Sequence, residues 1–449
     1  MSESSAIRRM SWRAVLQVCL LNIAVALMIL PLNSTLNRIM IIELRLPATL
    51  VAVLISLRFI TSPSRIWFGR LSDTRPIGGR RRTWYIASGM VVLAVGLIAS
   101  TYAALAIPDL GVAGIIISVL TFGLLGLGVN LTTPLYFAVV ADQSSPEQRP
   151  RVVATMFVLL GICAVAASFA LGAAVEPYTE QRMIRAFFAI AAIGLGLTVA
   201  GLFKLERKRT YELSSSSAVQ KTERPRAVRE LLLENRQALR FFVYLLFAFV
   251  AIEAQELILE PYAGEFLRMT PAETTRLTGI FRIPNVLSLA VGAWLVNRIG
   301  HKPTATAGIV VACLSLLLVI VSVPIQARAV LLAGVFVLGL GAGLLTTTNL
   351  ALMMNMTDPR HAGVFLGAWG FAQAVGVGSG NILGGVLRDT GLLLFASQLG
   401  GYYLAYAFEI ALLAAAVPML WALDVAAFQR AIADAPVETA AGVEKTGQP

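Results

Sequence analysis

Long apolar stretches, each followed by a short polar segment, run through almost the whole chain. Each stretch has about the length that an α-helix needs to cross the hydrocarbon core of a bilayer, roughly 20 residues. We therefore predict an all-α membrane protein. Its twelve membrane-spanning helices are expected at about residues 14–42, 48–71, 83–106, 112–140, 152–175, 184–203, 239–262, 272–297, 304–325, 328–353, 362–386 and 398–423.

The two halves of the chain repeat one another. Arg58 and Arg282 lie inside corresponding apolar stretches, 224 residues apart. A second offset, of 213 residues, aligns Leu125-Gly-Leu-Gly128 with Leu338-Gly-Leu-Gly341. Internal repeats are typical of transporter folds, in which the working site lies at the interface between the repeats. We therefore expect one intramembrane arginine at the same depth in each half.

Composition and charge agree with a membrane protein. Hydrophobic residues make up 57% of the chain and charged residues 14%, against roughly 45–50% and 25% in soluble domains. In a soluble protein the net charge of +11 would suggest nucleic acid as a partner. Here the Lys and Arg residues are concentrated in segments on one side of the predicted membrane, which predicts cytoplasmic N- and C-termini. The expected partner is the lipid bilayer, and no nucleic acid.

The chain divides into four predicted parts. Residues 1–203 and 239–424 are expected to form two six-helix bundles. Between them, residues 204–238 form a cytoplasmic linker, in which a basic amphipathic helix beginning at Pro225 is expected to lie on the anionic leaflet. A helix that docks a partner is the alternative for this segment. The small, polar tail, residues 425–449, is predicted to be disordered.

Two corresponding loops carry candidate gating residues. The segment Gly69-Arg-Leu-Ser-Asp73, followed by Arg80 and Arg81, resembles the loop between helices 2 and 3 of the major facilitator superfamily. The second copy has Asn297 and Arg298, so its acidic residue is lost. A helix-end carboxylate that faces arginines across the interface between the halves can hold the cytoplasmic side shut. The alternative is that these charges only set the topology.

Charged residues inside the predicted spans are the main functional signal. A charge at the bilayer centre costs about 2.5–3.5 kcal/mol, so such groups should face the protein interior and find partners. Glu253, Glu256 and Glu260 lie three and four residues apart, on one stripe of a helix, where mutual repulsion makes at least one a candidate for proton binding. Arg282 lies at the depth of Glu253, and we expect these two side chains to form an ion pair.

The first half offers amides and arginines instead. Asn33 and Asn37 lie one helical turn apart, and Arg38 lies beside them. Arg58 is expected to face the acidic stripe of the second half. The alternative is that all these groups only neutralise one another and hold the two halves together.

Two segments point to a narrower family. They are Leu32-Asn33-Ser-Thr-Leu-Asn37-Arg38-Ile-Met-Ile-Ile-Glu43-Leu and Gln255-Glu-Leu-Ile-Leu-Glu260-Pro261-Tyr262-Ala-Gly264. Both resemble signatures of the PucC/LhaA family, the bacteriochlorophyll-delivery branch of the major facilitator superfamily. The resemblance implies a factor for assembly of light-harvesting antenna complexes in the intracytoplasmic photosynthetic membrane of a bacterium. It implies (bacterio)chlorophyll as cargo rather than as a tightly bound cofactor. Antenna polypeptides and pigment-synthesis enzymes are the protein partners it suggests.

The residue chemistry is compatible with pigment handling without requiring it. The two histidines, His301 and His361, lie in predicted loops, yet magnesium also accepts oxygen ligands. Pro261 removes a backbone donor, so we expect the seventh span, at about residues 239–262, to break at Glu260. The candidate residues of the central cavity are Asn33, Asn37, Arg38, Arg58, Glu253, Glu256, Glu260, Tyr262 and Arg282.

Three classes of function remain open from the sequence. The first is an antenna-assembly factor that delivers or handles pigment, as the family segments imply. The second is a proton-coupled transporter of a small solute, for which the glutamate stripe and the intramembrane arginines argue. The third is a non-transporting subunit of photosynthetic complexes. We do not expect an enzyme, because the sequence has no Walker-type motif, metal-ligand cluster or nucleophile–base arrangement.

Overall fold

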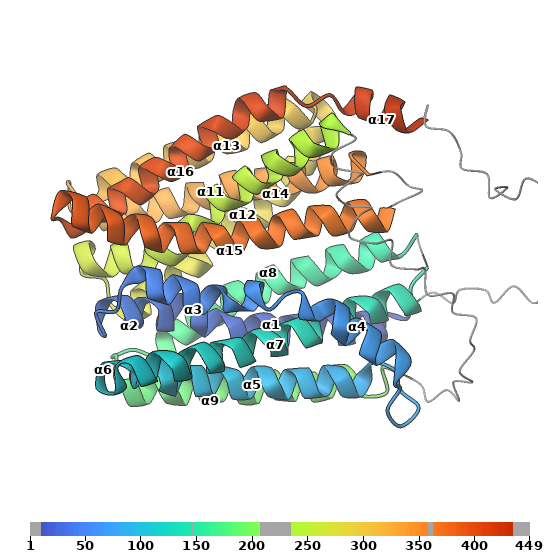
Figure 1. The fold of residues 1–449 in the computed structure, drawn as a ribbon, viewed down its shortest axis with the longest axis horizontal. Helices are drawn as coiled ribbons and strands as arrows, with labels where there is room; N and C mark the ends of the chain where they lie inside the picture. Colours follow the sequence, from blue (N-terminus) through green and yellow to red (C-terminus); the bar gives the residue numbers. More distant parts are fainter. Residues whose placement is uncertain (1–9, 146, 207–234, 358–361, 434–449) are drawn as a thin grey trace, which may run out of the picture.

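The structure, a computed structural model, describes residues 10–145, 147–206, 235–357 and 362–433, and these residues fold almost entirely into helices (Figure 1). The helices of the first half are α1 (Trp12–Pro31), η1 (Leu32–Leu36), α2 (Asn37–Ile42), α3 (Ala48–Ile60), α4 (Ser64–Thr74), α5 (Thr83–Leu105), α6 (Ile107–Leu110), α7 (Val112–Gln143), α8 (Arg149–Ala174) and α9 (Glu180–Leu202). Those of the second half are α11 (Arg236–Leu267), α12 (Pro271–Ile299), α13 (His301–Ser322), α14 (Arg328–Asn355), α15 (Ala362–Phe395), α16 (Gln398–Trp421) and α17 (Val425–Ala433).

The helices are long enough and apolar enough to cross a membrane many times. In the described part of the chain, 11 helical segments meet this criterion. The 34-residue helix α15 lies in the same bundle and corresponds to the predicted span 362–386. Exposed Leu, Ile, Val and Phe side chains cover the outside of these helices, as expected for a surface that contacts lipid.

Both ends of the described chain lie at the same end of the bundle, on the right in Figure 1. We call it the terminal end. The loop between α4 and α5 also lies there. The opposite, distal end carries the turns between α2 and α3 and between α15 and α16.

The two halves lie side by side and meet along two pairs of helices (Figure 1). One pair is α8 with α12, and the other is α3 with α15. The η1–α2 segment adds further contacts with α11 and α12. Small residues allow the close approach: a Cβ on Gly172 or Gly385 would lie within 3.0 Å of backbone in the other half. The glycines therefore serve helix packing here, as in other membrane bundles.

The first two spans, α1–η1–α2 and α3–α4, each contain an irregular segment. Helix 1 changes to a π-helical turn directly after Pro31, over Leu32–Leu36. Such turns often occur at functional sites, and this one carries Asn33. The second span is interrupted between α3 and α4, where Pro63 follows Thr61 and Ser62. Irregular backbone at this depth requires polar partners inside the protein.

The tail prediction was wrong for its first residues. Val425–Ala433 form the short helix α17, and the ring of Phe428 is fully buried against that of Phe365, with centroids 5.6 Å apart. Burial of this aromatic face stabilises a helix that composition alone did not suggest. The predicted amphipathic helix of the linker and the remainder of the tail lie outside the described residues.

Candidate functional site

The centre of the molecule holds a chain of polar contacts that joins three helices. Arg58 of α3 donates from Nη1 to Oδ1 of Asn33 at 2.7 Å. Asn33, in the π-helical turn, donates from Nδ2 to Oε1 of Glu256 of α11 at 3.0 Å. The Arg58 side chain is nearly buried and lies over the ring of Phe59 at 4.6 Å. The expectation that Arg58 faces the acidic stripe is met through an intervening amide.

The predicted ion pair between Arg282 and Glu253 is not present. No ion pair within 4.0 Å joins these two described side chains, although they interact electrostatically. Arg58 and Glu256 also interact with Glu253. The guanidinium of Arg282 lies 5.8 Å from the ring centroid of Phe281. Glu253 and Arg282 are thus near enough to interact electrostatically, but the glutamate shares its surroundings with Arg58 of the first half rather than pairing directly with Arg282.

The seventh span, helix α11, does not break at Glu260, which corrects the prediction. Helix α11 continues through Pro261 to Leu267. Proline lacks the N–H that would bond to the carbonyl of Leu257, one turn earlier. Asn37 of the first half supplies the missing donor, from Nδ2 to the oxygen of Leu257 at 2.7 Å. The helix is therefore completed by a side chain of the other half.

The two family segments meet at this point. Arg38 pairs with Glu43 at 2.8 Å and donates from Nη2 to the Met269 carbonyl at 3.1 Å. A Cβ on Gly264 would lie 2.8 Å from Nε of Arg38, so glycine provides the room for this guanidinium. Glu260 is buried and accepts a hydrogen bond from Oγ1 of Thr278 at 3.0 Å. Its second oxygen, Oε2, is buried without a partner among the described residues.

Tyr262 does not lie in the central cavity, contrary to the prediction. Its side chain is fully buried inside the second half, between Tyr402 and Tyr406. Its hydroxyl donates to the carbonyls of Val319 and Ile320. The residue therefore stabilises the packing of α11 against α13 and α16.

A clasp between the halves at the distal end was missed by the sequence analysis. Asp389 of α15 accepts hydrogen bonds from the backbone N–H groups that begin α3: Ala48 at 3.2 Å and Thr49 at 2.8 Å. Arg388 holds this carboxylate at 3.0 Å and also contacts Glu265 at 3.5 Å. A carboxylate at a helix N-terminus satisfies donors that have no partner within the helix. In the sequence, Asp389 is simply an acidic residue just past a predicted span. Such a residue is too common to indicate a contact between the halves.

The backbone at the interruption between α3 and α4 is bound by Asn130 of α7, which was not predicted. This amide donates to the carbonyl of Arg58 and to Oγ1 of Thr61, both at 2.9 Å. Its oxygen accepts from Nε of Arg65 at 2.6 Å. Asn130 thus satisfies the backbone next to Arg58 and fixes the place of that arginine.

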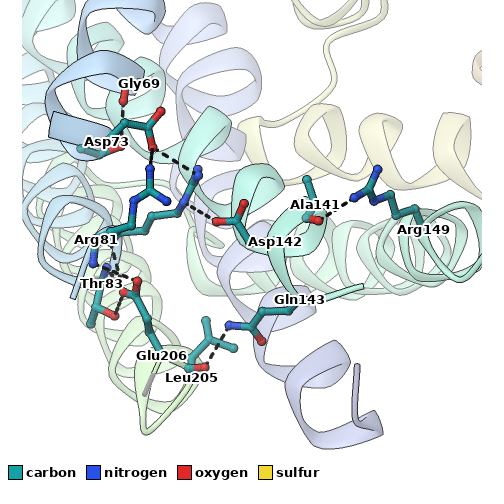
Figure 2. A network of polar contacts seen from close by, with 12 residues as sticks. Gly69, Asp73, Arg81, Thr83, Ala141, Asp142, Gln143, Arg149, Leu205 and Glu206 are labelled. Carbon is teal, nitrogen blue, oxygen red and sulfur yellow. Dashed lines mark hydrogen bonds and ion pairs between the residues drawn. The ribbon is translucent and has the colours of Figure 1, made fainter. Parts of the chain in front are cut away.

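The candidate gating residues at the terminal end form a network within the first half (Figure 2). Asp73 pairs with Arg81 at 2.9 Å and with Arg82 at 3.4 Å, and Arg82 pairs with Asp142 at 2.9 Å. The predicted contact between Asp73 and Arg81 is present, but the described partners of Asp73 all belong to the first half, so in this structure Asp73 does not join the two halves. The guanidinium of Arg80 makes no hydrogen bond or ion pair with another described residue, and its Nε is buried without a partner.

Glu206, in the segment that follows α9, joins the same network. Its carboxylate accepts hydrogen bonds from the N–H groups of Arg81, Arg82 and Thr83, at the start of α5 (Figure 2). Burial alone would raise the pKa of Glu206, but these bonds outweigh it and lower the pKa below its ordinary value. In the second half, Asn297 and Arg298 are exposed, and Arg298 lies over Trp294 at 5.3 Å. Neither forms a hydrogen bond or ion pair with another described residue.

The contacts between the halves are distributed unevenly along the membrane. Between described residues, the inter-half hydrogen bonds and ion pairs lie in the middle of the bundle or at its distal end. Glu253 and Glu256 are partly exposed and Arg282 is exposed, whereas Glu260, nearer the distal end, is buried. The arrangement is closed at the distal end, and it presents both carboxylates and a guanidinium to the space between the halves.

Comparison with known proteins agrees with this architecture. The chain is similar to the nucleoside transporter NupG (TM-score 0.67, 14% identity, covering 90% of this chain and 98% of that one). It is also similar to a D-xylose–proton symporter (TM-score 0.66, 15% identity, 92% and 96%). These likenesses show the major facilitator fold of an all-α, multi-pass membrane protein, as predicted.

Similarity in sequence is more specific. Protein PucC of Cereibacter sphaeroides is 30% identical over 402 residues, which cover 87% of this chain and 86% of the relative. A protein of Rhodobacter capsulatus named bacteriochlorophyll synthase 44.5 kDa chain is 28% identical, with 85% and 88% covered. The family model described as PUCC protein matches residues 35–428. The chain therefore belongs to the PucC family.

Proposed function

We propose that the chain is a light-harvesting antenna assembly factor that delivers or handles (bacterio)chlorophyll. One observation carries the proposal: the two segments that resemble the family signatures come from different halves and contact each other. Asn37 donates to the Leu257 carbonyl, and Arg38 packs closely against Gly264. The names of the relatives, which refer to PucC and to bacteriochlorophyll synthase, support the same direction. We propose no enzymatic activity, since the fold is that of transporters.

We place the protein in the intracytoplasmic photosynthetic membrane of a bacterium, with both termini in the cytoplasm. The concentration of basic residues at the terminal end supports this orientation. Residues 1–203 and 239–424 are then the two bodies whose relative movement changes access to the centre. With the distal clasp closed, cargo would enter from the cytoplasmic side or from the bilayer. Antenna polypeptides and pigment-synthesis enzymes are the proposed partners.

Glu260 provides the test of this function. Glu260→Gln keeps an oxygen that can accept from Thr278 but removes the ionisable carboxyl. A strain that lacks the wild-type gene and carries this variant should insert the protein normally, yet accumulate less antenna complex by absorption spectroscopy. Glu180→Gln, at an exposed position on α9, is the matched control and should restore antenna levels fully. Normal antenna levels in the Glu260→Gln strain would count against the proposed role.

The second candidate function is a proton-coupled transporter of a small solute. Glu253 and Glu256, close together beside the central space, favour it because adjacent carboxylates readily share a proton. Proton-driven solute uptake into proteoliposomes, with no pigment bound by the purified protein, would support this function over pigment delivery.

A further inference from the structure

The packing of α3 against α15 ends near the middle of the second span. A Cβ on Gly385 would lie 2.6 Å from the Ala48 carbonyl, and one on Gly378 would lie 3.1 Å from the Cβ of Phe59. Oγ of Ser56 also donates to the carbonyl of Gly378 at 3.3 Å. The two halves are therefore in contact along this seam from the distal end to about the level of Phe59.

The remainder of the second span, α4, turns away from α15 (Figure 1). Asn130 of α7 binds the backbone at the interruption and accepts from Nε of Arg65 at 2.6 Å, and α4 packs on α7. Residues two apart point to roughly opposite sides of a helix. Thr61 meets Gly126 of α7, whereas Phe59 meets α15, so α7 and α15 lie on opposite sides of the second span. Trp67, two residues after Arg65, accordingly faces away from α7.

The two surfaces left apart by this turn are apolar and uncovered. Trp67 and Ile66 of α4 are 60% and 63% exposed. On α15, the stripe that meets α3 at Gly378 continues two turns further to Phe371, which is 61% exposed. Gly367, one turn beyond Phe371, has no atom within 4 Å of the place of a Cβ. We call these four residues, Ile66, Trp67, Gly367 and Phe371, the lateral opening.

We propose that the cargo enters and leaves the protein through the lateral opening, directly from the bilayer. This proposal rests on the proposed function for its cargo, an uncharged, esterified pigment with a long hydrocarbon chain. A route through the aqueous cytoplasmic side would expose that chain to water, whereas a route from the bilayer keeps it in an apolar medium. Trp67 and Phe371, one on each wall, can stack on a flat conjugated ring. The glycine at position 367 leaves room for the ring to pass.

The second seam between the halves, α8 with α12, offers a matched comparison. Gly279 meets Ser168 there, and Gly161 meets Val286. Both helices are continuous, so neither is turned away from the other by an interruption. The α12 stripe that meets α8 continues two turns past Val286 to Ala293, which is exposed. Ala293 therefore occupies the place in this seam that Phe371 occupies in the other, and we expect no passage there.

The rate of pigment uptake from a bilayer tests the lateral opening. Vesicles that contain the purified full-length protein are fused with vesicles that carry bacteriochlorophyll, and binding is followed by the change in pigment absorption. Gly367→Trp, which fills the opening, should slow uptake at least about tenfold and leave the affinity at equilibrium unchanged, because it blocks the path rather than the binding site. Ala293→Trp, in the other seam, is the matched control and should take up pigment at the wild-type rate. Benzoylphenylalanine in place of Phe371, irradiated during uptake, should become cross-linked to the pigment.

The outcomes separate this route from the proposed function. Equal rates in correctly folded Gly367→Trp and in Ala293→Trp overturn the lateral opening, while pigment binding by the wild type keeps the proposed function. Slower uptake in Ala293→Trp alone assigns entry to the other seam and also overturns it. Capture of an antenna polypeptide instead of pigment at position 371 in native membranes would make this surface a docking site for a helix, against the proposal. A wild type that takes up no pigment removes the proposed function and the route together.

Discussion

Replacing Asp389 with alanine should open the distal end of the molecule. The carboxylate holds the first N–H groups of α3 from the opposite half, with bonds of 3.2 and 2.8 Å. These bonds can form only while α3 and α15 are in contact. Their loss therefore destabilises the state that is closed at the distal end and leaves the open state unaffected. Arg388 keeps Glu265 as a partner at 3.5 Å, so the substitution does not leave that arginine without a carboxylate.

The size of the effect follows from the geometry. Hydrogen bonds to a charged group contribute about 1.5–3 kcal/mol each, and loss of a helix-capping side chain costs about 0.5–2 kcal/mol. The Asp389 side chain is 21% exposed, which favours the lower part of these ranges. A loss of about 2 kcal/mol changes the ratio of closed to open molecules roughly 30-fold. Asp389→Asn, which keeps one acceptor oxygen, should give a smaller shift.

Labelling of a buried cysteine measures this ratio. With Cys19, Cys163 and Cys313 replaced, a cysteine at Thr275 is covered by Thr35 at the distal end. A membrane-impermeant maleimide added on the distal side should label it faster in Asp389→Ala than in the wild type. Asp109→Ala, which alters an exposed acidic residue at the same end, is the control and should not change the rate. Equal rates in Asp389→Ala and in this control would refute the clasp.

Three further predictions concern stability. Asn37→Leu leaves the Leu257 carbonyl without a donor and should destabilise the protein by about 1–3 kcal/mol in thermal unfolding. In a Pro261→Ala background the helix supplies its own N–H, so the same substitution should lower the stability much less. Equal losses of stability in both backgrounds would contradict the pairing. Gly264→Val should displace Arg38 from its place over α11 and lower the melting temperature, whereas Gly123→Val, with open space around it, should not. The lowered pKa of Glu206 means that its contribution is present above the ordinary glutamate pKa of about 4.3 and is lost as the pH falls through the folded value. The difference in melting temperature between wild type and Glu206→Gln should therefore shrink on acidification, and a constant difference would show that the carboxylate does not act through its charge.

The sequence predicted those features that depend on periodicity and repetition. The membrane-spanning helices follow from where apolar stretches begin and end. The family was also identified correctly, because the residue types of its two segments are unusual within a membrane helix. The contacts between these segments were not predicted. Pro261 suggests a break when α11 is considered alone, and the donor to the Leu257 carbonyl comes from Asn37, 220 residues before Leu257.

The partners of the irregular helices could not be predicted for a related reason. Asn130 and Asp389 act on backbone groups of α3, and Glu206 acts on the start of α5. A single polar residue near a helix end belongs to no motif or spacing that would indicate its distant partner. The expected ion pair of Arg282 with Glu253 failed for the same reason. The position of a residue along its helix says how deep it lies, but not toward which neighbour its side chain points.

Isolation of the protein from a photosynthetic membrane tests the central claim most directly. Affinity purification of the full-length chain in mild detergent, followed by absorption spectroscopy and identification of the co-purifying polypeptides, reports cargo and partners together. Our account predicts a (bacterio)chlorophyll absorption band and antenna polypeptides in the wild-type preparation, both reduced with Glu260→Gln and unchanged with Glu180→Gln. A pigment-free preparation without antenna polypeptides, from cells that are assembling antenna complexes, would contradict it.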